Sequence, residues 1–187
     1  MKKIPTIFKR NAENMSELTR ESHEDCAWVF AGEGVATRKY DGSCCLIEGN
    51  VLYKRRELRK GQEHPFNFTQ VSYDEVTGKT VGWMPVNLDA AEDKWHAEAF
   101  ADRSDCSTFP WEDGTYELIG PKVQGNLEGL SHHFLMRHDD AQTYATAPRT
   151  FDALKDWLTR QDIEGLVFHH PDGRRAKIKK KDFGLDR

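Results

Sequence analysis

Two short turn sequences constrain the fold of this chain more than any other feature. The pair Gly49-Asn50 separates the β-rich runs C-C-L-I-E and V-L-Y-K-R. Later in the chain, Pro171-Asp172-Gly173 separates G-L-V-F-H-H from R-R-A-K-I-K-K. Turn residues of these types between two β-rich runs are typical of β-hairpins. A hairpin joins antiparallel strands, so the sequence predicts a fold that contains antiparallel sheet.

The remaining segments predict a mixture of strands and helices. A helix is expected in T-F-D-A-L-K-D-W-L, whose apolar residues have helical spacing. The sequence D-A-A-E at 89–92 resembles a capping box and predicts a helix with Trp95 and Ala99 on one face. Residues 12–25 are expected to hold a short helix and residues 57–79 a loop. Further strands are expected in C-A-W-V-F, G-V-A-T-R-K-Y, T-V-G-W-M-P-V, G-T-Y-E-L-I-G and H-H-F-L-M-R-H.

These elements indicate an α+β fold with antiparallel sheet. The chain has 187 residues, which suffices for a domain with a real core, and no linker divides the sequence. We therefore expect a single domain that spans residues 1–187.

Charge is segregated along the chain although the formal net charge is only -4. The region from Asp74 to Asp113 is acidic, whereas Lys54 to Lys60 and Arg174 to Lys181 are strongly basic. A net acidic balance argues against a wholly basic nucleic-acid binder, and two basic strips on such a protein favour a local anionic ligand. The alternative interpretation is a solvated charged face.

The cysteines and the apolar segments indicate a soluble, cytoplasmic protein. No C-x-x-C pair occurs, and the neighbours Cys44 and Cys45 would point to opposite faces of a strand, which favours a reducing compartment over a disulfide framework or zinc site. No signal peptide is visible, and no apolar stretch approaches the roughly 20 residues of a membrane helix. The four cysteines are Cys26, Cys44, Cys45 and Cys106.

Lys39, in the stretch A-T-R-K-Y-D-G-S-C-C, is a candidate nucleophile. A free lysine has a pKa of about 10.4, so it must lose a proton before it can attack. Desolvation and nearby cations favour the neutral amine. Asp41 could orient the amine or assist a metal, and Gly42 would permit a tight turn near a ligand. The alternative is a surface lysine before a turn. The cations that the two hairpins could supply are Arg38, Arg55, Arg56, Lys177 and Lys179.

Two carboxylates and a pair of lysines extend this pattern. Glu117 lies mid-strand in E-L-I-G-P-K, where a buried carboxylate would need a ribose hydroxyl or a cation as its partner. Glu164 stands at the head of the strand G-L-V-F, a position that suits a hard cation such as Mg²⁺. Lys177 and Lys179 alternate across Ile178 and project from one face, as a polyphosphate site requires. The alternative for each is a solvated charge.

The ordered segments K-Y-D-G, Y-K-R-R, Y-E-L-I-G-P-K, E-G-L-V-F and A-K-I-K resemble the nucleotidyltransferase motifs of covalent polynucleotide ligases and capping enzymes. E-L-I-G-P-K-V-Q and G-L-V-F-H-H-P-D-G-R-R-A-K-I-K are most similar to ATP-dependent RNA ligases, in particular to the small 5′–3′ RNA ligase family that has a vertebrate member. The resemblance spans nearly the whole chain. It implies an adenylyltransferase (ATP-grasp-like) domain with two antiparallel sheets that flank a nucleotide cleft.

The resemblance also implies a role for each matched residue. Lys39 corresponds to the lysine that attacks the α-phosphate of ATP and becomes adenylylated, and Lys177 and Lys179 to the pair that binds this phosphate. Glu117 corresponds to the ribose-binding carboxylate and Glu164 to the metal-linked one, for Mg²⁺ or Mn²⁺. Arg55 is assigned to ribose or phosphate, with Arg56 as the alternative, and Lys122 is assigned to phosphate. Asp41 lies beside the nucleophile, and Phe134 either stacks on adenine or belongs to the core.

The implied substrates are ATP and RNA with 5′-phosphate and 3′-hydroxyl ends, with no membrane and no obligate protein partner. Only eight residues follow Lys179, so we expect no C-terminal OB-fold or helical domain, and RNA contact is expected from basic segments such as K-K-K-D-F-G. The missing OB-fold domain counts against a DNA ligase or a GTP-using capping enzyme. A non-catalytic nucleotide- or RNA-binding module is the other alternative.

The histidine pairs at 132–133 and 169–170 are interpreted as structural or surface residues. Adjacent strand residues face opposite ways, so each pair offers only one ligand to a given metal site. His170, beside the second hairpin turn, could instead contact RNA.

Overall fold

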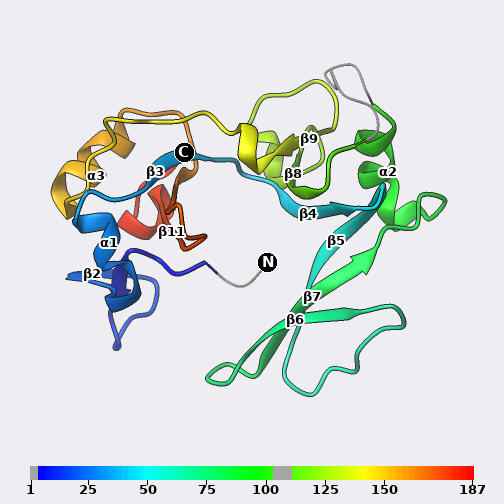
Figure 1. Cartoon of the computed structure of the whole chain (residues 1–187), viewed down its shortest axis with the longest axis horizontal. Helices are drawn as coiled ribbons and strands as arrows, with labels where there is room; N and C mark the ends of the chain where they lie inside the picture. The colour runs from blue at the N-terminus through cyan, green and yellow to red at the C-terminus, as the bar shows by residue number, and fades with distance from the viewer. Residues whose placement is uncertain (1–3, 103–110) are drawn as a thin grey trace. The chain divides into compact units, whose positions relative to one another are not determined.

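A computed structural model describes residues 4–102 and 111–187, and it has the expected α+β composition (Figure 1). The described chain forms two compact units. The central unit comprises residues 41–140, and the terminal unit combines residues 4–40 with residues 141–187. The described residues form three antiparallel sheets, of two, three and six strands, where two sheets were expected.

The terminal unit is built on the three-stranded sheet, with strand order β11-β10-β3. β3 spans Val35–Lys39, β10 spans Gly165–His169 and β11 spans Arg175–Lys179. β10 and β11 form the predicted second hairpin, and β3 pairs antiparallel with the other edge of β10. A separate two-stranded sheet and two helices complete the unit: β1 Phe8–Arg10, β2 Leu18–Ser22, α1 Ala27–Phe30 and α3 Phe151–Thr159.

Alternation along these strands divides the terminal sheet into a buried face and an open face. Alternate side chains of a strand point to opposite faces. The buried face packs with α1 and α3 into one apolar core, and α1 and α3 are drawn next to each other in Figure 1. The core residues of the sheet are Ala36, Leu166, Phe168, Ala176 and Ile178, and those of the helices are Trp28, Val29, Leu154 and Leu158. Lys39, Lys177 and Lys179 therefore project from the open face.

The central unit holds the six-stranded sheet, with strand order β6-β7-β5-β4-β8-β9. The predicted first hairpin is formed by β4 and β5, and its turn residues Gly49 and Asn50 have φ values of 57° and 62°. Two successive positive φ values define the type I′ turn that matches the twist of a hairpin. The strands are β4 Ser43–Glu48, β5 Val51–Leu58, β6 Thr69–Asp74, β7 Lys79–Pro85, β8 Gly114–Ile119 and β9 Phe134–Arg137.

One face of the central sheet is covered by an apolar core that includes helix α2, Lys94–Ala101. Ala99 is fully buried in this core and Trp95 packs against it, as the sequence predicted. The sheet contributes Cys45, Ile47, Leu52, Tyr116, Leu118 and Leu135. Glu117 lies between Tyr116 and Leu118 and therefore projects from the opposite face.

Several local predictions were wrong. C-A-W-V-F forms helix α1 and not a strand, the segment 12–25 contains strand β2, and the predicted loop 57–79 contains strand β6. The capping box predicted at 89–92 is absent, because α2 is entered through a 3-10 helix and its N-cap residue is Asp93. The Asp93 carboxylate caps no helix N–H and is bound instead to Lys54 and to the backbone N–H of Asn87. The 3-10 helices are Glu24–Cys26, Ala91–Asp93, Gln124–Asn126, His138–Asp140 and Lys180–Phe183.

Among the residues that the structure describes, no helix is both long and apolar enough to cross a bilayer. Cys26, Cys44 and Cys45 are free thiols, and Cys106 lies outside the described residues. Cys45 is fully buried in the core of the central unit, and Cys44, its neighbour on β4, points to the other face as predicted. Burial raises the pKa of the Cys45 thiol well above its usual value.

Candidate functional site

The register of the terminal sheet brings three lysines to one face. Lys39 on β3 and Lys179 on β11 are both paired with Gly165 on β10, so the two lysines flank this glycine in one row. Lys177 is paired with Val167 in the next row, on the same face. The sequence alone placed Lys177 and Lys179 on a common face, and the pairing of β3 with β10 adds Lys39 to it.

Gly165 occupies a position where no side chain fits. A Cβ atom at this residue would lie 2.1 Å from the carbonyl oxygen of Ile178 and 2.7 Å from the Cα of Lys179. Both neighbours are backbone atoms of β11, so a larger residue would push this strand away. The glycine therefore keeps the strand that carries Lys179 close to the strand end that carries Lys39.

Glu164 supplies the carboxylate beside these lysines. The Lys39 ammonium forms an ion pair with the Glu164 carboxylate and also donates a hydrogen bond of 3.3 Å to the carbonyl oxygen of Tyr40. The Lys39 and Glu164 side chains are only 21% and 18% exposed. The carbonyl oxygen of Glu164 accepts the backbone N–H of Lys180 at 2.9 Å, which connects the head of β10 to the end of β11.

Lys177 is the lysine whose titration is most altered. Burial, together with the positive charges of Lys39 and Lys179, lowers the pKa of Lys177 to about 8. Asp182 and Glu164 act in the opposite direction. The cluster thus concentrates positive charge in a partly desolvated place, which suits a group of phosphate oxygens.

Asp182 holds the end of β11 and was missed by the sequence analysis. Its side chain is 4% exposed, accepts the backbone N–H of Lys179 at 3.0 Å and pairs with Arg10 at 2.7 Å. The sequence feature that could have predicted its role is its position as a single carboxylate at the end of the basic run K-I-K-K-K-D. A carboxylate buried there must have partners, and the neighbouring basic residues and backbone N–H groups can supply them. Asp182 fixes the backbone from which Lys179 projects.

On the open face of the central sheet, Glu117 is linked to two polar side chains. Glu117 is 8% exposed and accepts a hydrogen bond of 3.0 Å from Nε2 of His138. Nδ1 of the same ring lies 2.9 Å from Oγ1 of Thr115. Neither His138 nor Thr115 was singled out from the sequence, since a single histidine at the end of the predicted strand H-H-F-L-M-R-H gives no signal of its own.

Strand alternation separates the two candidate arginines. Arg55 is paired with Trp83 and Arg56 with Gly82, and both arginines are exposed. Counting across the paired strands, Arg55 shares the open face with Glu117, whereas Arg56 lies on the face of the apolar core. Phe134 on β9 also lies on the face of Glu117, and it is only partly buried.

The candidates Gly42, Asp41 and Lys122 also lie in the central unit. A Cβ at Gly42 would lie 2.2 Å from the carbonyl oxygen of Leu118 and 2.7 Å from Cγ of Glu117, so this glycine permits close packing against β8. The backbone N–H of Asp41 donates to Glu128 at 2.9 Å. The backbone N–H of Lys122 donates to Nε2 of His133 at 3.2 Å, which ties the loop after β8 to β9.

The histidines of the two pairs have intramolecular partners. His133 is 3% exposed, bonds to Glu98 at 2.7 Å and stacks on Trp95, so its role is structural. His169 lies 3.0 Å from Thr37 Oγ1. His132 Nε2 lies 3.7 Å from a carboxylate oxygen of Asp102.

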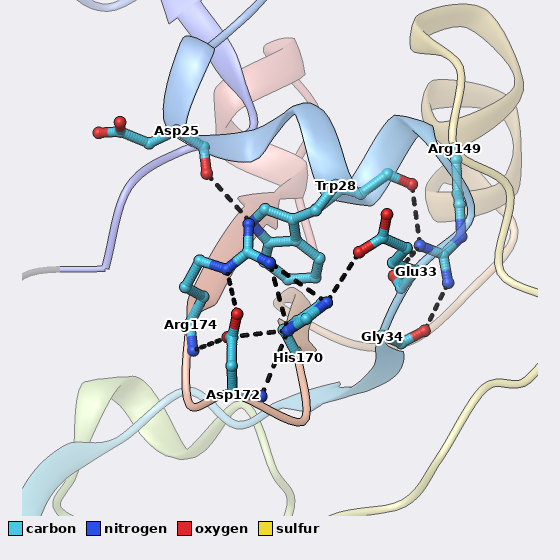
Figure 2. A network of polar contacts seen from close by, with 9 residues as sticks. Asp25, Trp28, Glu33, Gly34, Arg149, His170, Asp172 and Arg174 are labelled. Carbon is cyan, nitrogen blue, oxygen red and sulfur yellow. Dashed lines mark hydrogen bonds and ion pairs between the residues drawn. The ribbon is translucent and has the colours of Figure 1, made fainter.

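His170 belongs to the polar network of Figure 2, in the terminal unit. Its ring bonds to Glu33 at 2.8 Å and to Asp172 at 2.8 Å, and it packs edge-on against Trp28. In the same network, Arg149 donates to the carbonyl oxygens of Glu33 and of Gly34. These contacts tie the turn of the β10–β11 hairpin to the loop that leads into β3.

Within the described residues, no group of three or more histidine, cysteine, aspartate or glutamate side chains could hold a metal ion. Glu164 nevertheless fits a Mg²⁺ site of the kind that uses one or two carboxylates, with phosphate and water as the other ligands.

Comparison with curated proteins shows a distant likeness to an RNA ligase. No protein-family model matches the chain. Among curated proteins, RNA ligase 1 of Rattus norvegicus is 22% identical over 219 aligned residues, which cover 81% of this chain and 67% of the rat protein. The chain is therefore distantly similar to an RNA ligase over most of its length.

Proposed function

We propose that this protein is an ATP-dependent RNA ligase of the lysine-adenylylating type, with an adenylyltransferase fold. It would join RNA 5′-phosphate and 3′-hydroxyl ends through a lysyl-AMP intermediate and an RNA-adenylate. The observation that carries the proposal is the open face of the terminal sheet, where Lys39 pairs with Glu164 beside Lys177 and Lys179. The distant likeness to rat RNA ligase 1 supports the same class of reaction.

In the first step, the unprotonated Nζ of Lys39 attacks the α-phosphorus of ATP. A phosphoramide N–P bond forms, the bond between the α-phosphorus and the bridging oxygen to the β-phosphorus breaks, and pyrophosphate leaves. After the N–P bond forms, the nitrogen is positively charged, and it gives up one proton to solvent or to a neighbouring base. Lys177 and Lys179 place positive charge where negative charge develops on the phosphoryl oxygens, which is the main source of rate in such transfers.

In the second step, an oxygen of the RNA 5′-phosphate attacks the phosphorus of lysyl-AMP. The N–P bond breaks, Lys39 recovers a proton, and the RNA carries AMP through a 5′–5′ pyrophosphate bond. In the third step, the 3′-hydroxyl oxygen of the other RNA end attacks the 5′-phosphorus and its proton passes to solvent. The P–O bond to the bridging oxygen of the 5′–5′ pyrophosphate breaks, and AMP leaves as the phosphodiester forms. The same cationic face would serve all three steps, since each transfers charge between phosphate oxygens.

For the central unit, we propose nucleoside recognition on the open face of the sheet. Glu117 would accept a hydrogen bond from a ribose hydroxyl, Arg55 would contact ribose or phosphate, and Phe134 would stack on adenine. Their common face supports these assignments, and it favours Arg55 over Arg56. Lys122 and Asp41 are proposed as further cofactor-binding residues.

A divalent cation, Mg²⁺ or Mn²⁺, would be held by Glu164 together with the phosphates of ATP. Bound there, it would neutralise phosphate charge and act as a Lewis acid. The protein's own contribution at this point is a single partly buried carboxylate that orients the Lys39 amine.

RNA contact is proposed for exposed residues of the basic segments Lys54–Lys60 and Arg174–Lys181, such as Arg59, Lys60 and Lys181. Lysine and arginine side chains contact the RNA backbone irrespective of sequence, so binding through these segments should weaken as salt rises. The free thiols of Cys26, Cys44 and Cys45 support a reducing compartment, and we propose the cytoplasm.

The decisive experiment is the intact-protein mass after incubation with ATP and Mg²⁺. Wild type should gain one AMP, Lys39→Ala should gain none, and Lys9→Ala, an exposed lysine of the same unit, should react as wild type. A protein that is already adenylylated is recognised by its starting mass and is first discharged with pyrophosphate. A 5′-phosphorylated RNA is then added to test transfer and joining.

The same experiment distinguishes an RNA ligase from the two alternative functions. Labelling by GTP, or joining of DNA ends in place of RNA, would indicate a capping-type enzyme or a DNA ligase. RNA binding without labelling by ATP, GTP or NAD would replace the ligase proposal with a nucleotide- or RNA-binding module.

A further inference from the structure

We infer that His138 is a positioning residue that fixes the Glu117 carboxylate and thereby sets the selectivity of this protein for a ribonucleotide over a deoxyribonucleotide. The inference rests on the proposed function, which assigns the ribose of ATP to Glu117. It adds His138 and Thr115 to the recognition of the sugar.

Thr115 and Glu117 are two residues apart on β8, so their side chains project from the same face of the sheet. His138 directly follows β9, the neighbouring strand, and its ring bridges the two side chains. Nε2 lies 3.0 Å from Oε2 of Glu117, and Nδ1 lies 2.9 Å from Oγ1 of Thr115. One imidazole therefore connects a hydroxyl to a carboxylate.

The chemistry of the three groups fixes the direction of the hydrogen bond to Glu117. An ionised carboxylate only accepts hydrogen bonds, so Nε2 of His138 carries the proton that it donates. In the neutral ring, Nδ1 then accepts from the Thr115 hydroxyl; in the charged ring, both nitrogens donate. In either state one carboxylate oxygen of Glu117 is held by the ring.

Close packing also restricts the methylene group that carries the Glu117 carboxylate. Gly42 lies so close that a Cβ there would be 2.7 Å from Cγ of Glu117, and Glu117 is 8% exposed. Across residues 4–102 and 111–187, Oε1 of Glu117 accepts no hydrogen bond, whereas Oε2 is bound by His138. A rigid carboxylate with one oxygen in use presents the other to a donor at a defined place.

The donor that fits is a ribose hydroxyl. An acceptor that is fixed in advance discriminates strongly between a ligand that carries the hydroxyl and one that lacks it, because the site cannot rearrange to compensate. A mobile carboxylate could turn to water or to another donor and would discriminate less. His138 should therefore affect nucleotide binding and sugar selectivity more than the rate of phosphoryl transfer.

The test measures the rate of self-adenylylation against the concentration of ATP, 2′-deoxyATP and 3′-deoxyATP. For His138→Ala we expect the half-saturating ATP concentration to rise about tenfold, as for a lost hydrogen bond to a charged group. The preference for ATP over the discriminated deoxy analogue should shrink by a similar factor, and the maximal rate should stay within about twofold. His138→Gln should recover part of both effects, because its amide N–H can donate to Glu117.

The matched control is His132→Ala, a histidine of the same unit whose side chain is 46% exposed. It should leave all three quantities unchanged. In a Glu117→Ala background, His138→Ala should add little, because a positioning residue acts only through the group that it positions. Circular dichroism and thermal melting of each variant verify that the fold is kept.

The inference is overturned if His138→Ala keeps the wild-type half-saturating concentration and sugar preference, or if its effect adds in full to that of Glu117→Ala. A loss of maximal rate alone would also overturn it. If wild type is adenylylated by no nucleotide, the proposed function fails and takes the inference with it. Normal adenylylation with an unaffected His138 variant removes the inference alone.

Discussion

Lys39 and Glu164 lie 125 positions apart in the sequence and form an ion pair in the terminal unit. The pairing of β3 with β10 makes this contact, because Lys39 ends β3 opposite Gly165 and Glu164 directly precedes Gly165. The proposed nucleophile is thus oriented by a carboxylate from the opposite end of the chain.

Glu164→Gln should lower the rate of self-adenylylation about 100-fold, since a small misplacement of a reacting group has effects of this size. The amide keeps the volume of the side chain but loses the charge that holds the Lys39 ammonium. Initial rates of AMP transfer to the protein measure the effect. Glu17→Gln, an exposed carboxylate of the same unit, should match wild type, and an equal rate for Glu164→Gln would refute the role of the pair.

Lys177→Met should make the protein more stable at pH 7 while it reduces adenylylation at least tenfold. The pKa of Lys177 is lowered to about 8 by burial and by Lys39 and Lys179, so the charged form is disfavoured in the folded state. Below pH 8, Lys177 is charged in the folded protein, and its partly buried charge lowers the free energy of unfolding. Removing it should raise the free energy of unfolding by about 2 kcal/mol.

The pH dependence of this difference has a defined sign. Between pH 8 and the ordinary pKa of 10.5, the unfolded chain binds a proton that the folded chain has lost, so wild-type stability gains from Lys177 as pH rises. The advantage of Lys177→Met should therefore shrink from pH 8 to pH 10.5. Urea unfolding at several pH values measures it, with Lys9→Met as the control. An advantage that grows with pH would show that the lowered pKa is wrong.

Gly165→Ala should destabilise the protein by about 3 kcal/mol, because its Cβ meets the backbone of β11 and forces the strand to move. The same shift should displace Lys179 and lower adenylylation. Gly173→Ala is the matched control: it has a φ of +91° but meets no atom within 4 Å, so it should cost only about 1 kcal/mol. Thermal and urea unfolding give both values, and equal costs would argue against the close packing at Gly165.

Arg55→Ala should raise the half-saturating ATP concentration for adenylylation about tenfold, as expected for the loss of a charge-assisted hydrogen bond. Arg56→Ala should change it by less than about twofold. The two arginines are adjacent and both exposed, but only Arg55 shares the open face with Glu117. A larger effect of Arg56→Ala would reverse the assignment.

Local chemistry explains which parts of the fold could be predicted. Both hairpins were predicted correctly, because Gly49-Asn50 and Pro171-Asp172-Gly173 specify their turns without help from distant residues. The run C-A-W-V-F was assigned to a strand and forms a helix, because a short apolar run has no clear period and tertiary packing decides its state. β6 was missed for a related reason: none of its residues is buried, and they become a strand by pairing with β7.

The candidate site divides in the same way. By itself the sequence determined that Lys177 and Lys179 share a face and that Glu117 points away from Tyr116 and Leu118, because strand alternation depends only on spacing. The tertiary structure decided what meets these side chains. The pairing of β3 with β10 brings Lys39 to Glu164, and the pairing of β8 with β9 brings His138 to Glu117. These pairings bring together residues that are 125 and 21 positions apart. Their free energy comes from burying the apolar faces of whole sheets, which no local pattern records.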